Sequence, residues 1–295
     1  MGYVLQFIAM ASFGISNCLW AYPLKEMPVF LVIGIRAGLT SLLFLLLILL
    51  QYNFSFTGLK PFLFPVEQLS AVNIFPAIIF CSISYFGLFF FNKSIKYGAV
   101  SISIPILSFG SIIGIVAGIL LYNESFTILK FIITTIFILG LWCIEKLNPA
   151  IWRLQLSKGV LYSLLATVFW SAGIFFPMAI KSLGVLWFSL VLELTVCVMS
   201  WAGLLIKQKG IISNVLSYPV KQNWKWIFSL AVCGFSGVLF SNLALFHLPL
   251  HILGMMGIIQ PVVSLVVANM LLKEKLQMVQ YAGVLLILLG MWLTI

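Results

Sequence analysis

The chain has 295 residues, of which 63% are hydrophobic and only 7% are charged, whereas soluble domains are about 45–50% apolar and about 25% charged. One soluble core of this size could not bury so much apolar surface, so the composition excludes a cytosolic enzyme, a nucleic-acid-binding protein and a disordered segment. The net charge of +10 comes from cations that lie between apolar runs, which is typical of membrane topology.

Ten apolar runs follow one another along the chain, each close to the roughly 20 residues that cross a bilayer. We therefore predict ten transmembrane helices, at residues 3–23, 29–51, 70–91, 99–121, 126–145, 158–180, 184–206, 224–246, 250–272 and 277–295. Longer polar connections, 52–69 and 207–223, follow the second and seventh runs.

The second half of the chain repeats the first. With a shift of 150 residues, identical pairs are Gly87 and Gly237, Phe90 and Phe240, Asn92 and Asn242, Glu124 and Glu274, Gly140 and Gly290, and Trp142 and Trp292. Nearer the N-terminus the shift is 156, which aligns Phe13 with Phe169. Each copy holds five spans, an odd number, so the second copy must enter the membrane from the opposite side. The predicted fold is an all-α membrane protein of two inverted five-helix repeats, residues 1–148 and 149–295, with a site at the midplane between them.

Lysine and arginine residues near the span ends predict the orientation. The side of the N-terminus receives Lys60, Lys130 and Lys181. The other side receives Lys25, Lys93, Lys96, Lys146, Arg153, Lys158, Lys207, Lys209, Lys221, Lys225, Lys273 and Lys275. The positive-inside rule places that second side in the cytoplasm and both termini outside, as in a multi-pass protein of the bacterial inner membrane.

Several short motifs point to a known superfamily. Residues 16–20 read Ser-Asn-Cys-Leu-Trp, residues 260–264 read Gln-Pro-Val-Val-Ser, and residues 271–276 read Leu-Leu-Lys-Glu-Lys-Leu, which residues 120–126 echo in the first half. In these motifs and in its repeat, the chain resembles the drug/metabolite transporter superfamily, in particular EamA-type carriers of bacteria. The resemblance implies a cavity built from spans one to four and six to nine, with spans five and ten peripheral.

Glu193 is the acid that lies well inside a predicted span, about nine residues or about 13 Å from its start. A carboxylate in hydrocarbon is costly and usually faces a cavity with a functional role. Ser189, Cys197 and Ser200 share its helical face. Glu193 could carry a proton or attract an organic cation. The alternative is a structural carboxylate paired with a neighbouring helix.

Arg36 lies about seven residues into the second span, and the 156-residue shift aligns it with the neighbour of Glu193. One interpretation is an ion pair between the two halves that opens and closes during transport. The other, which the sequence favours, is that the arginine snorkels to the membrane surface.

Aromatic and amide side chains inside the spans supply further candidates. An aromatic pair with one carboxylate can enclose an ammonium group, although many membrane aromatics face lipid. Gln260 precedes a proline that can expose a backbone carbonyl at membrane depth. The predicted substrate-binding residues are Glu193, Trp20, Trp170, Tyr85, Gln260, Asn17, Ser16 and Ser189, and those predicted for gating or coupling are Glu193 and Arg36.

Other motifs are interpreted as structural. Glu124 and Glu274 precede the fifth and tenth spans, where a carboxylate complements the positive end of the following helix. Gly110, Gly114 and Gly118 form a GxxxGxxxG seam, either internal or between two protomers.

His247 and His251 are spaced for a metal site on a helix, but Pro249 lies between them and no third ligand is near. We therefore expect no metal site, and a proton-sensing role at the outer face is the better functional interpretation.

The favoured function is a secondary active transporter that moves a small amphipathic metabolite (an amino acid, an amine or a nucleoside-like compound) by alternating access, coupled to protons or to exchange. We expect no catalytic residues and no cofactor. The sequence contains no Walker A motif, so we expect no ATP drive within this chain. The expected partners are the substrate and the lipid bilayer, with no nucleic acid, in a monomer or homodimer. The alternatives are a lipid-handling protein or scramblase and, least supported, an integral-membrane enzyme.

Overall fold

The computed structural model describes residues 1–56, 71–98, 100–125, 127–145, 157–208, 217–272 and 278–294. These ranges are helical and contain no strand. The elements are α1 (Gly2–Leu19), α2 (Ala21–Glu26), α3 (Val29–Phe56), α4 (Ala71–Tyr97), α5 (Val100–Tyr122), α6 (Ile128–Glu145), α8 (Lys158–Trp170), the 3-10 helix η1 (Ser171–Phe175), α9 (Phe176–Leu183), α10 (Val185–Lys207), α12 (Val220–His247), α13 (Leu250–Gly257), α14 (Ile259–Leu272) and α15 (Met278–Thr294).

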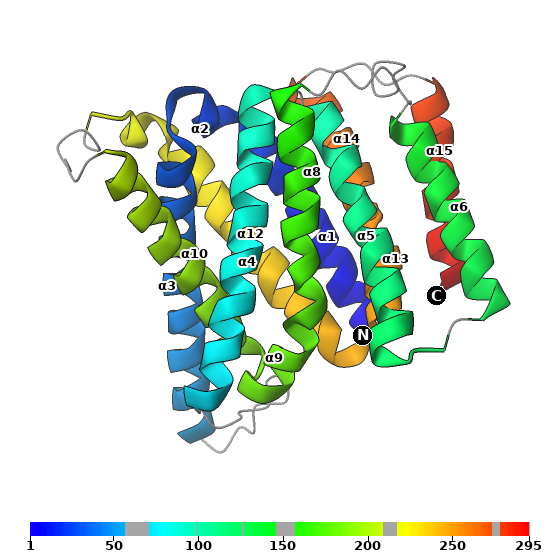
Figure 1. The fold of residues 1–295 in the computed structure, drawn as a ribbon, viewed down its shortest axis with the longest axis horizontal. Helices are drawn as coiled ribbons and strands as arrows, with labels where there is room; N and C mark the ends of the chain where they lie inside the picture. The colour runs from blue at the N-terminus through cyan, green and yellow to red at the C-terminus, as the bar shows by residue number, and fades with distance from the viewer. Residues whose placement is uncertain are drawn as a thin grey trace.

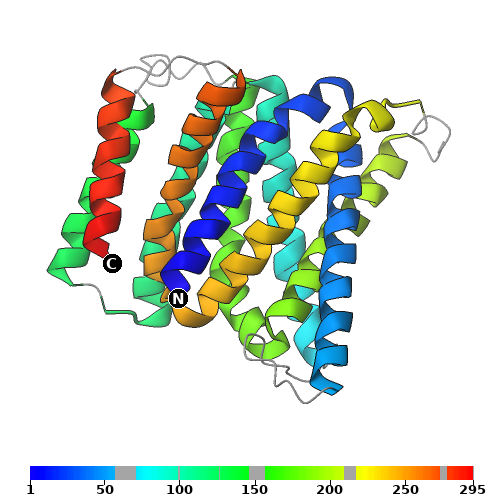
Figure 2. The same cartoon turned by 180° about the vertical axis from the view of Figure 1, so that it is seen from behind.

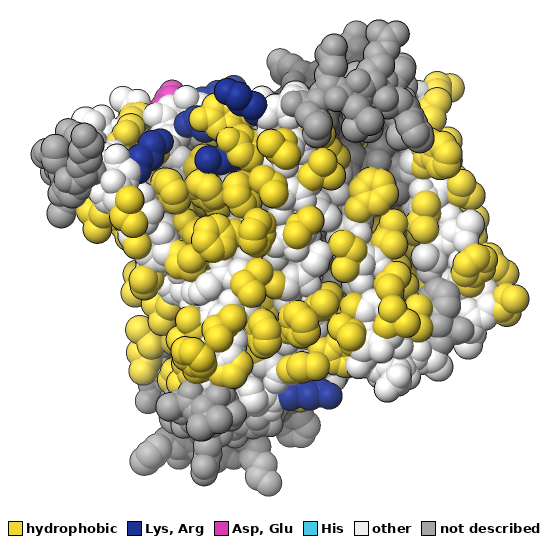
Figure 3. Space-filling view, viewed as in Figure 1, with side chains coloured by type: hydrophobic (Ala, Val, Ile, Leu, Met, Phe, Trp, Pro, Cys, Tyr) yellow, Lys and Arg dark blue, Asp and Glu magenta, His cyan; other side chains and the backbone are white. Residues whose placement is uncertain are grey.

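The helices have the length and apolar composition of membrane spans. Seven candidate spans lie among the described residues: Gly2–Glu26, Val29–Gln51, Ile74–Tyr97, Lys158–Leu183, Val185–Lys207, Val220–His247 and Leu250–Leu271. Three shorter apolar stretches are Ile106–Tyr122, Ile128–Gly140 and Met278–Gly290. Hydrophobic side chains cover most of the visible face of the molecule, and lysine and arginine side chains gather near its upper edge (Figure 3). The predicted all-helical membrane fold is confirmed, whereas the number of ten spans stays a prediction.

The helix contacts between the two halves are symmetric: where a helix of one half packs against the other half, its counterpart makes the equivalent contact. In the repeat, α1 corresponds to α8, α3 to α10, α4 to α12, α5 to the α13–α14 pair, and α6 to α15. Helix α1 packs against α12 and α14, and its counterpart α8 packs against α4 and α5. The remaining large contacts join counterparts directly: α3 with α10, α5 with α13, and α6 with α15. Helices α1 and α8 begin at opposite ends of the bundle, as an inverted repeat requires (Figures 1 and 2).

Helices α6 and α15 form a pair at one edge of the bundle (Figures 1 and 2). A Cβ atom added to Gly140 would meet the side chain of Ile287, and one added to Gly290 would meet the ring of Phe137. Gly140 and Gly290 are repeat partners, and so are Phe137 and Ile287. Each glycine therefore provides room for the large side chain that its partner helix presents.

The glycine seam on α5 packs inside the molecule, against α13. A Cβ on Gly114 would lie 3.7 Å from the Cα atom of Gly254, and a Cβ on Gly254 would meet the carbonyl oxygen of Ser111. Small residues on both helices thus let the two backbones approach closely, as in other membrane helix pairs. Of the two alternatives for this seam, the structure shows the internal one.

Glu124 caps a different helix from the one predicted. Its carboxylate accepts hydrogen bonds from the backbone N–H groups of Leu250, at 2.6 Å, and His251, at 2.8 Å, at the start of α13. The ring of His251, which is 1% exposed, places Nδ1 2.6 Å from the same carboxylate. From the sequence, Glu124 is expected to complement the helix that follows it, and His251 is expected at the outer face. Instead the carboxylate links the first half to the second, and His251 is buried. Glu274 lies outside the described residues.

Candidate functional site

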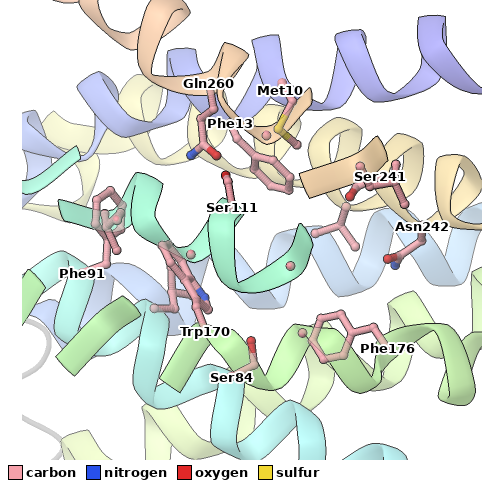
Figure 4. Close-up of a pocket in the computed structure, with 18 of the residues that line it drawn as sticks. Met10, Phe13, Ser84, Phe91, Ser111, Trp170, Phe176, Ser241, Asn242 and Gln260 are labelled. Carbon is pink, nitrogen blue, oxygen red and sulfur yellow. The ribbon is translucent and has the colours of Figure 1, made fainter. Parts of the chain in front are cut away.

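A cavity of about 400 Å³ lies between the two halves (Figure 4). Its lining residues come from α1, α3, α4, α5, α8, η1, α9, α10, α12, α13 and α14. Among the described residues, none of α6 or α15 contributes to it. The cavity is therefore shared by both repeats, and the peripheral pair of helices takes no part in its wall.

Helix α1 and its C-cap residue Trp20 present one continuous face to the cavity. Gln6, Met10, Phe13, Asn17 and Trp20 line it at alternating steps of four and three residues. This spacing keeps side chains on a single helical face. Of these five residues, only Asn17 and Trp20 are predicted site residues, although the same spacing extended toward the N-terminus reaches the other three.

Arg36 of α3 and Glu193 of α10 form a buried ion pair on the cavity wall. Nη1 of Arg36 donates to both carboxylate oxygens of Glu193, at 2.7 and 2.9 Å. The two residues are only 6% and 2% exposed. The favoured prediction that Arg36 snorkels to the membrane surface is wrong, because its guanidinium group points to Glu193. The alternative arrangement, an ion pair between the two halves, is present.

A glycine of α12 makes room for the arginine. A Cβ atom on Gly234 would collide with the Arg36 side chain at Nη2, Cζ and Nε. The guanidinium group therefore lies directly against the backbone of α12. Three helices, α3, α10 and α12, hold the charged pair in place.

One face of α10 carries Ser189, Glu193, Cys197 and Ser200. Of these four residues, only Glu193 lines the cavity. Ser189 donates to the carbonyl of Val185 and accepts a hydrogen bond of 2.9 Å from Nδ2 of Asn242 on α12. The thiol of Cys197 lies 3.6 Å from the carbonyl oxygen of Gly34 on α3. Ser189 thus orients α10 against α12 and lies behind the cavity wall.

Aromatic rings form much of the apolar wall. Trp20 and Trp170 both line the cavity, together with Phe13, Phe91 and Phe176. Figure 4 shows Trp170 and Phe176 turned toward the open space. The position that corresponds to Trp20 in the second repeat is that of Phe176, so the two halves place an aromatic ring at matching points. Tyr85, by contrast, is 3% exposed and does not line the cavity.

Two repeat-related glycines lie directly against two of these rings, those of Phe13 and Trp170. A Cβ on Gly237 of α12 would meet the ring of Phe13, and a Cβ on Gly87 of α4 would meet the ring of Trp170. Each ring belongs to the first long helix of the opposite half. The glycines therefore set how far Phe13 and Trp170 project into the cavity.

Polar side chains complete the wall. Nδ2 of Asn17 donates to Oγ of Ser264, at 3.1 Å, which ties α1 to α14. Ser16 donates to the carbonyl of Phe13 in its own helix. Gln260 and Ser111 face the cavity from α14 and α5 (Figure 4). Gln6 is 3% exposed, and its Oε1 has no hydrogen-bond partner among the described residues.

The structure brings together most of the predicted site residues. Those that line the cavity are Glu193, Arg36, Trp20, Trp170, Gln260, Asn17 and Ser16, whereas Tyr85 and Ser189 lie behind its wall. Their roles in binding and coupling stay predictions. Chemically, the site offers aromatic surface, a few neutral polar groups and one internally compensated pair of charges.

Comparisons with known proteins agree with this architecture. The sequence model of the EamA-like transporter family matches residues 1–145 and 157–295. Comparison with curated proteins finds no match. A solved structure described only as "Crystal structure of protein" is similar, with a TM-score of 0.69 and 13% sequence identity over 99% of this chain and 96% of that one. At that identity, the similarity shows the fold alone.

Proposed function

Since the chain belongs to the EamA-like transporter family, and is thus a membrane transporter of the drug/metabolite transporter superfamily, we propose that it is a secondary active transporter that moves a small amphipathic metabolite by alternating access. The observation that carries the proposal is the cavity between the two inverted repeats, with a charged pair on its wall. Members of this family are transporters and not enzymes.

The size and lining of the cavity support a small substrate. Ligand sites commonly have volumes of about 300–1,000 Å³ and apolar walls with a few polar groups. The cavity here, at about 400 Å³, fits that description. Inverted repeats with a site at their interface are also the arrangement of many secondary transporters.

The finer features of the proposal follow from the sequence. The repeats are residues 1–148 and 149–295, in the bacterial inner membrane, with both termini outside and the chain a monomer or homodimer. The substrate is an amino acid, an amine or a nucleoside-like metabolite. Opening of the Arg36–Glu193 ion pair accompanies the change of access, and Glu193 couples transport to protons or to exchange.

The test is counterflow in proteoliposomes that contain the purified protein. Vesicles preloaded with one member of a panel of amino acids, amines and nucleosides should accumulate the same labelled compound, because a carrier exchanges substrate across the membrane. A Glu193→Gln variant leaves Arg36 without its partner at membrane depth, so its flux should fall by at least about tenfold, a change in barrier of about 1.4 kcal/mol.

Glu26→Gln is the matched control, because Glu26 is exposed and lies outside the cavity. Its flux should equal that of the wild type. An absence of counterflow for the entire panel, combined with rapid scrambling of labelled lipid, would replace the transporter proposal with the lipid-handling alternative. Unchanged flux in Glu193→Gln would remove Glu193 from the mechanism.

A further inference from the structure

One turn at the end of α5 contacts two separate parts of the cavity wall. The hydroxyl group of Tyr122 donates a hydrogen bond of 2.6 Å to the carbonyl oxygen of Ile174 in η1. The carboxylate of Glu124 accepts hydrogen bonds of 2.6 and 2.8 Å from the backbone N–H groups of Leu250 and His251, the first residues of α13. Ile174 and Leu250 line the cavity. Resting on the proposed alternating access, we infer that Tyr122 and Glu124 form a gate that holds one end of the cavity closed and releases when that end opens.

The backbone of this turn allows both side chains to reach their partners. Asn123 has a φ of 51°, in the left-handed region that asparagine tolerates better than most residues. The chain therefore leaves the helical path after Tyr122, and the N–H group of Glu124 donates to the carbonyl oxygen of Gly118 at 3.1 Å. A Cβ atom on Gly118 would meet Oε2 of Glu124 and the backbone nitrogen of His251. The glycine thus provides the space in which the carboxylate contacts α13.

The partners of the gate belong to short segments at helix interruptions. Ile174 lies in η1, a 3-10 helix of five residues between α8 and α9, and such an insertion often marks a hinge. Leu250 begins α13, a helix of eight residues that Ile258 separates from α14. Helix α5, by contrast, is a single helix up to Tyr122. Movement of η1 and α13 can therefore break the contacts of the gate while the longer helices stay in place.

The opposite end of the bundle has weaker contacts between the halves. The 150-residue shift aligns Tyr122 with a leucine, which has no hydroxyl group. At that end, Tyr22 donates to the carbonyl oxygen of Leu271, but the distance of 3.4 Å indicates a weak bond. Glu26 accepts a hydrogen bond from Asn223, but Glu26 is exposed, so water competes for its carboxylate. The stronger contacts therefore favour closure of the end at which α5 ends and α1 begins (Figure 1).

The experiment measures access to the cavity from each side of the membrane. Gly173→Cys places a thiol on the cavity wall next to Ile174, where a Cβ atom would meet nothing within 4 Å. None of the five native cysteines lines the cavity, so the chain without Gly173→Cys gives the background. A membrane-impermeant sulfonated maleimide is applied to intact cells, which expose the gate end in the predicted orientation, and to inverted vesicles, which expose the opposite end. A cytoplasmic reporter inserted after Gln208 fixes that assignment independently.

Tyr122→Phe removes the hydroxyl group and retains the ring. Labelling from the gate end should become about fivefold faster, equivalent to about 1 kcal/mol, and labelling from the opposite end should not become faster. Glu124→Gln weakens the contacts with α13 and should act in the same direction. Because Glu124→Gln removes a charge that caps a helix, Tyr122→Phe keeps the test usable where that variant does not fold. Tyr22→Phe is the matched control, since it removes a hydroxyl contact at the opposite end, and it should not speed labelling from the gate end.

A gate predicts a change on one side of the membrane only. Faster labelling from both sides would indicate general loosening of the helices and would overturn the inference. Unchanged labelling in both gate variants, or an equal increase in Tyr22→Phe, would also overturn it.

Counterflow separates the gate from the proposed function. Counterflow combined with unchanged labelling would overturn the gate and leave the transporter function intact. One-sided labelling changes without counterflow of any compound would retain the gate and overturn the proposed function.

Discussion

At the scale of single residues, Glu124 links the two halves through three contacts with Leu250 and His251. Burial opposes ionisation of this carboxylate, but hydrogen bonds from the backbone and ring of His251 and from the backbone of Leu250 outweigh it, so the pKa of Glu124 lies below its usual value. A carboxylate at a helix N-terminus also interacts favourably with the helix dipole. The ionised form therefore stabilises the contact between α5 and α13.

We predict that Glu124→Gln lowers the free energy of unfolding by about 1–3 kcal/mol at neutral pH, the cost of weakening charge-assisted hydrogen bonds to partly buried groups. Because the folded-state pKa is lowered, this stabilisation is present above the unfolded-state pKa of about 4.3 and is lost as the pH falls through the folded-state value. The difference in melting temperature between wild type and variant should therefore shrink below about pH 4.

Glu26→Gln is the control for this comparison. Its carboxylate also accepts a hydrogen bond, from Nδ2 of Asn223, but Glu26 is exposed. Its effect on the melting temperature should be small. A difference between wild type and Glu124→Gln that stays constant from neutral to acidic pH would contradict the assigned role of the carboxylate.

The sequence predicts which polar residues matter better than it predicts their partners. Glu193 was identified by its depth in an apolar run, and Arg36 by its position in the repeat. The favoured partner of Arg36 was nevertheless the membrane surface, because hydropathy does not show what faces a side chain across a helix interface. Glu124 was assigned to the adjacent helix for the same reason. Tertiary packing, which decides these pairings, has no signal in the periodicity of one helix.

At the scale of secondary structure elements, the glycines of α4 and α12 determine the shape of the cavity. Gly87 and Gly237 are repeat partners, and each lies beneath an aromatic ring of the opposite half. A side chain at either position must displace that ring. The glycine pair that revealed the repeat in the sequence therefore also shapes the candidate binding site.

We predict that Gly237→Ala pushes the Phe13 ring into the cavity and that Gly87→Ala does the same with Trp170. Overpacking of this kind costs about 1–3 kcal/mol of stability. Affinity for substrates with large bodies should fall by about tenfold, equivalent to about 1.4 kcal/mol, while small substrates are less affected. Thermal unfolding and calorimetric titration of both variants measure these effects.

Gly173 provides the control, because it lies on the cavity wall itself and a Cβ atom there would meet nothing within 4 Å. Gly173→Ala should preserve stability and affinity. If all three alanine variants lose stability and affinity equally, the losses arise from the added methyl group alone. Displacement of the rings would then not be their cause.

The sequence predicts the helices better than their interruptions. Residues 250–272 and 158–180 were each predicted as one span, because both are continuously apolar. The structure divides the first into α13 and α14 and inserts the 3-10 helix η1 into the second. Gly254 and Gly257 lie directly against Ser111 at this end of α13. Such a break depends on close packing with another helix, which composition does not reveal.

At the scale of the whole molecule, we predict that both termini lie outside the cytoplasm. A fluorescent or enzymatic reporter that is active only in the cytoplasm should stay silent when fused after Ile295. The same reporter inserted after Gln208, which follows the C-terminal lysine of α10 at the other end of the bundle, should be active. The physical reason is the excess of lysine and arginine at that end.

The comparison of the two fusions includes its own control, because both depend on the same chain and the same insertion machinery. A strong signal after Ile295 together with silence after Gln208 would reverse the predicted orientation. Activity at both positions would indicate that the chain inserts in two orientations.

The repeat allowed the global arrangement to be predicted, since two odd-numbered copies must be inverted whatever their side chains. The family assignment follows from the same pattern and is confirmed by the matched residues. The cavity itself was only partly predictable. Tyr85 and Ser189 share polar or aromatic character with the lining residues, but helix rotation turns them away from the open space. That rotation depends on all neighbouring helices together.

The neutrality of the Arg36–Glu193 ion pair has an electrical consequence. An uncompensated charge that crosses the membrane gains or loses about 2.3 kcal/mol for each 100 mV of membrane potential. The paired charges of this site sum to zero. In the proposed cycle, the voltage across the membrane therefore does no net work on the empty site, and only a charged substrate or a coupled proton would make transport respond to it.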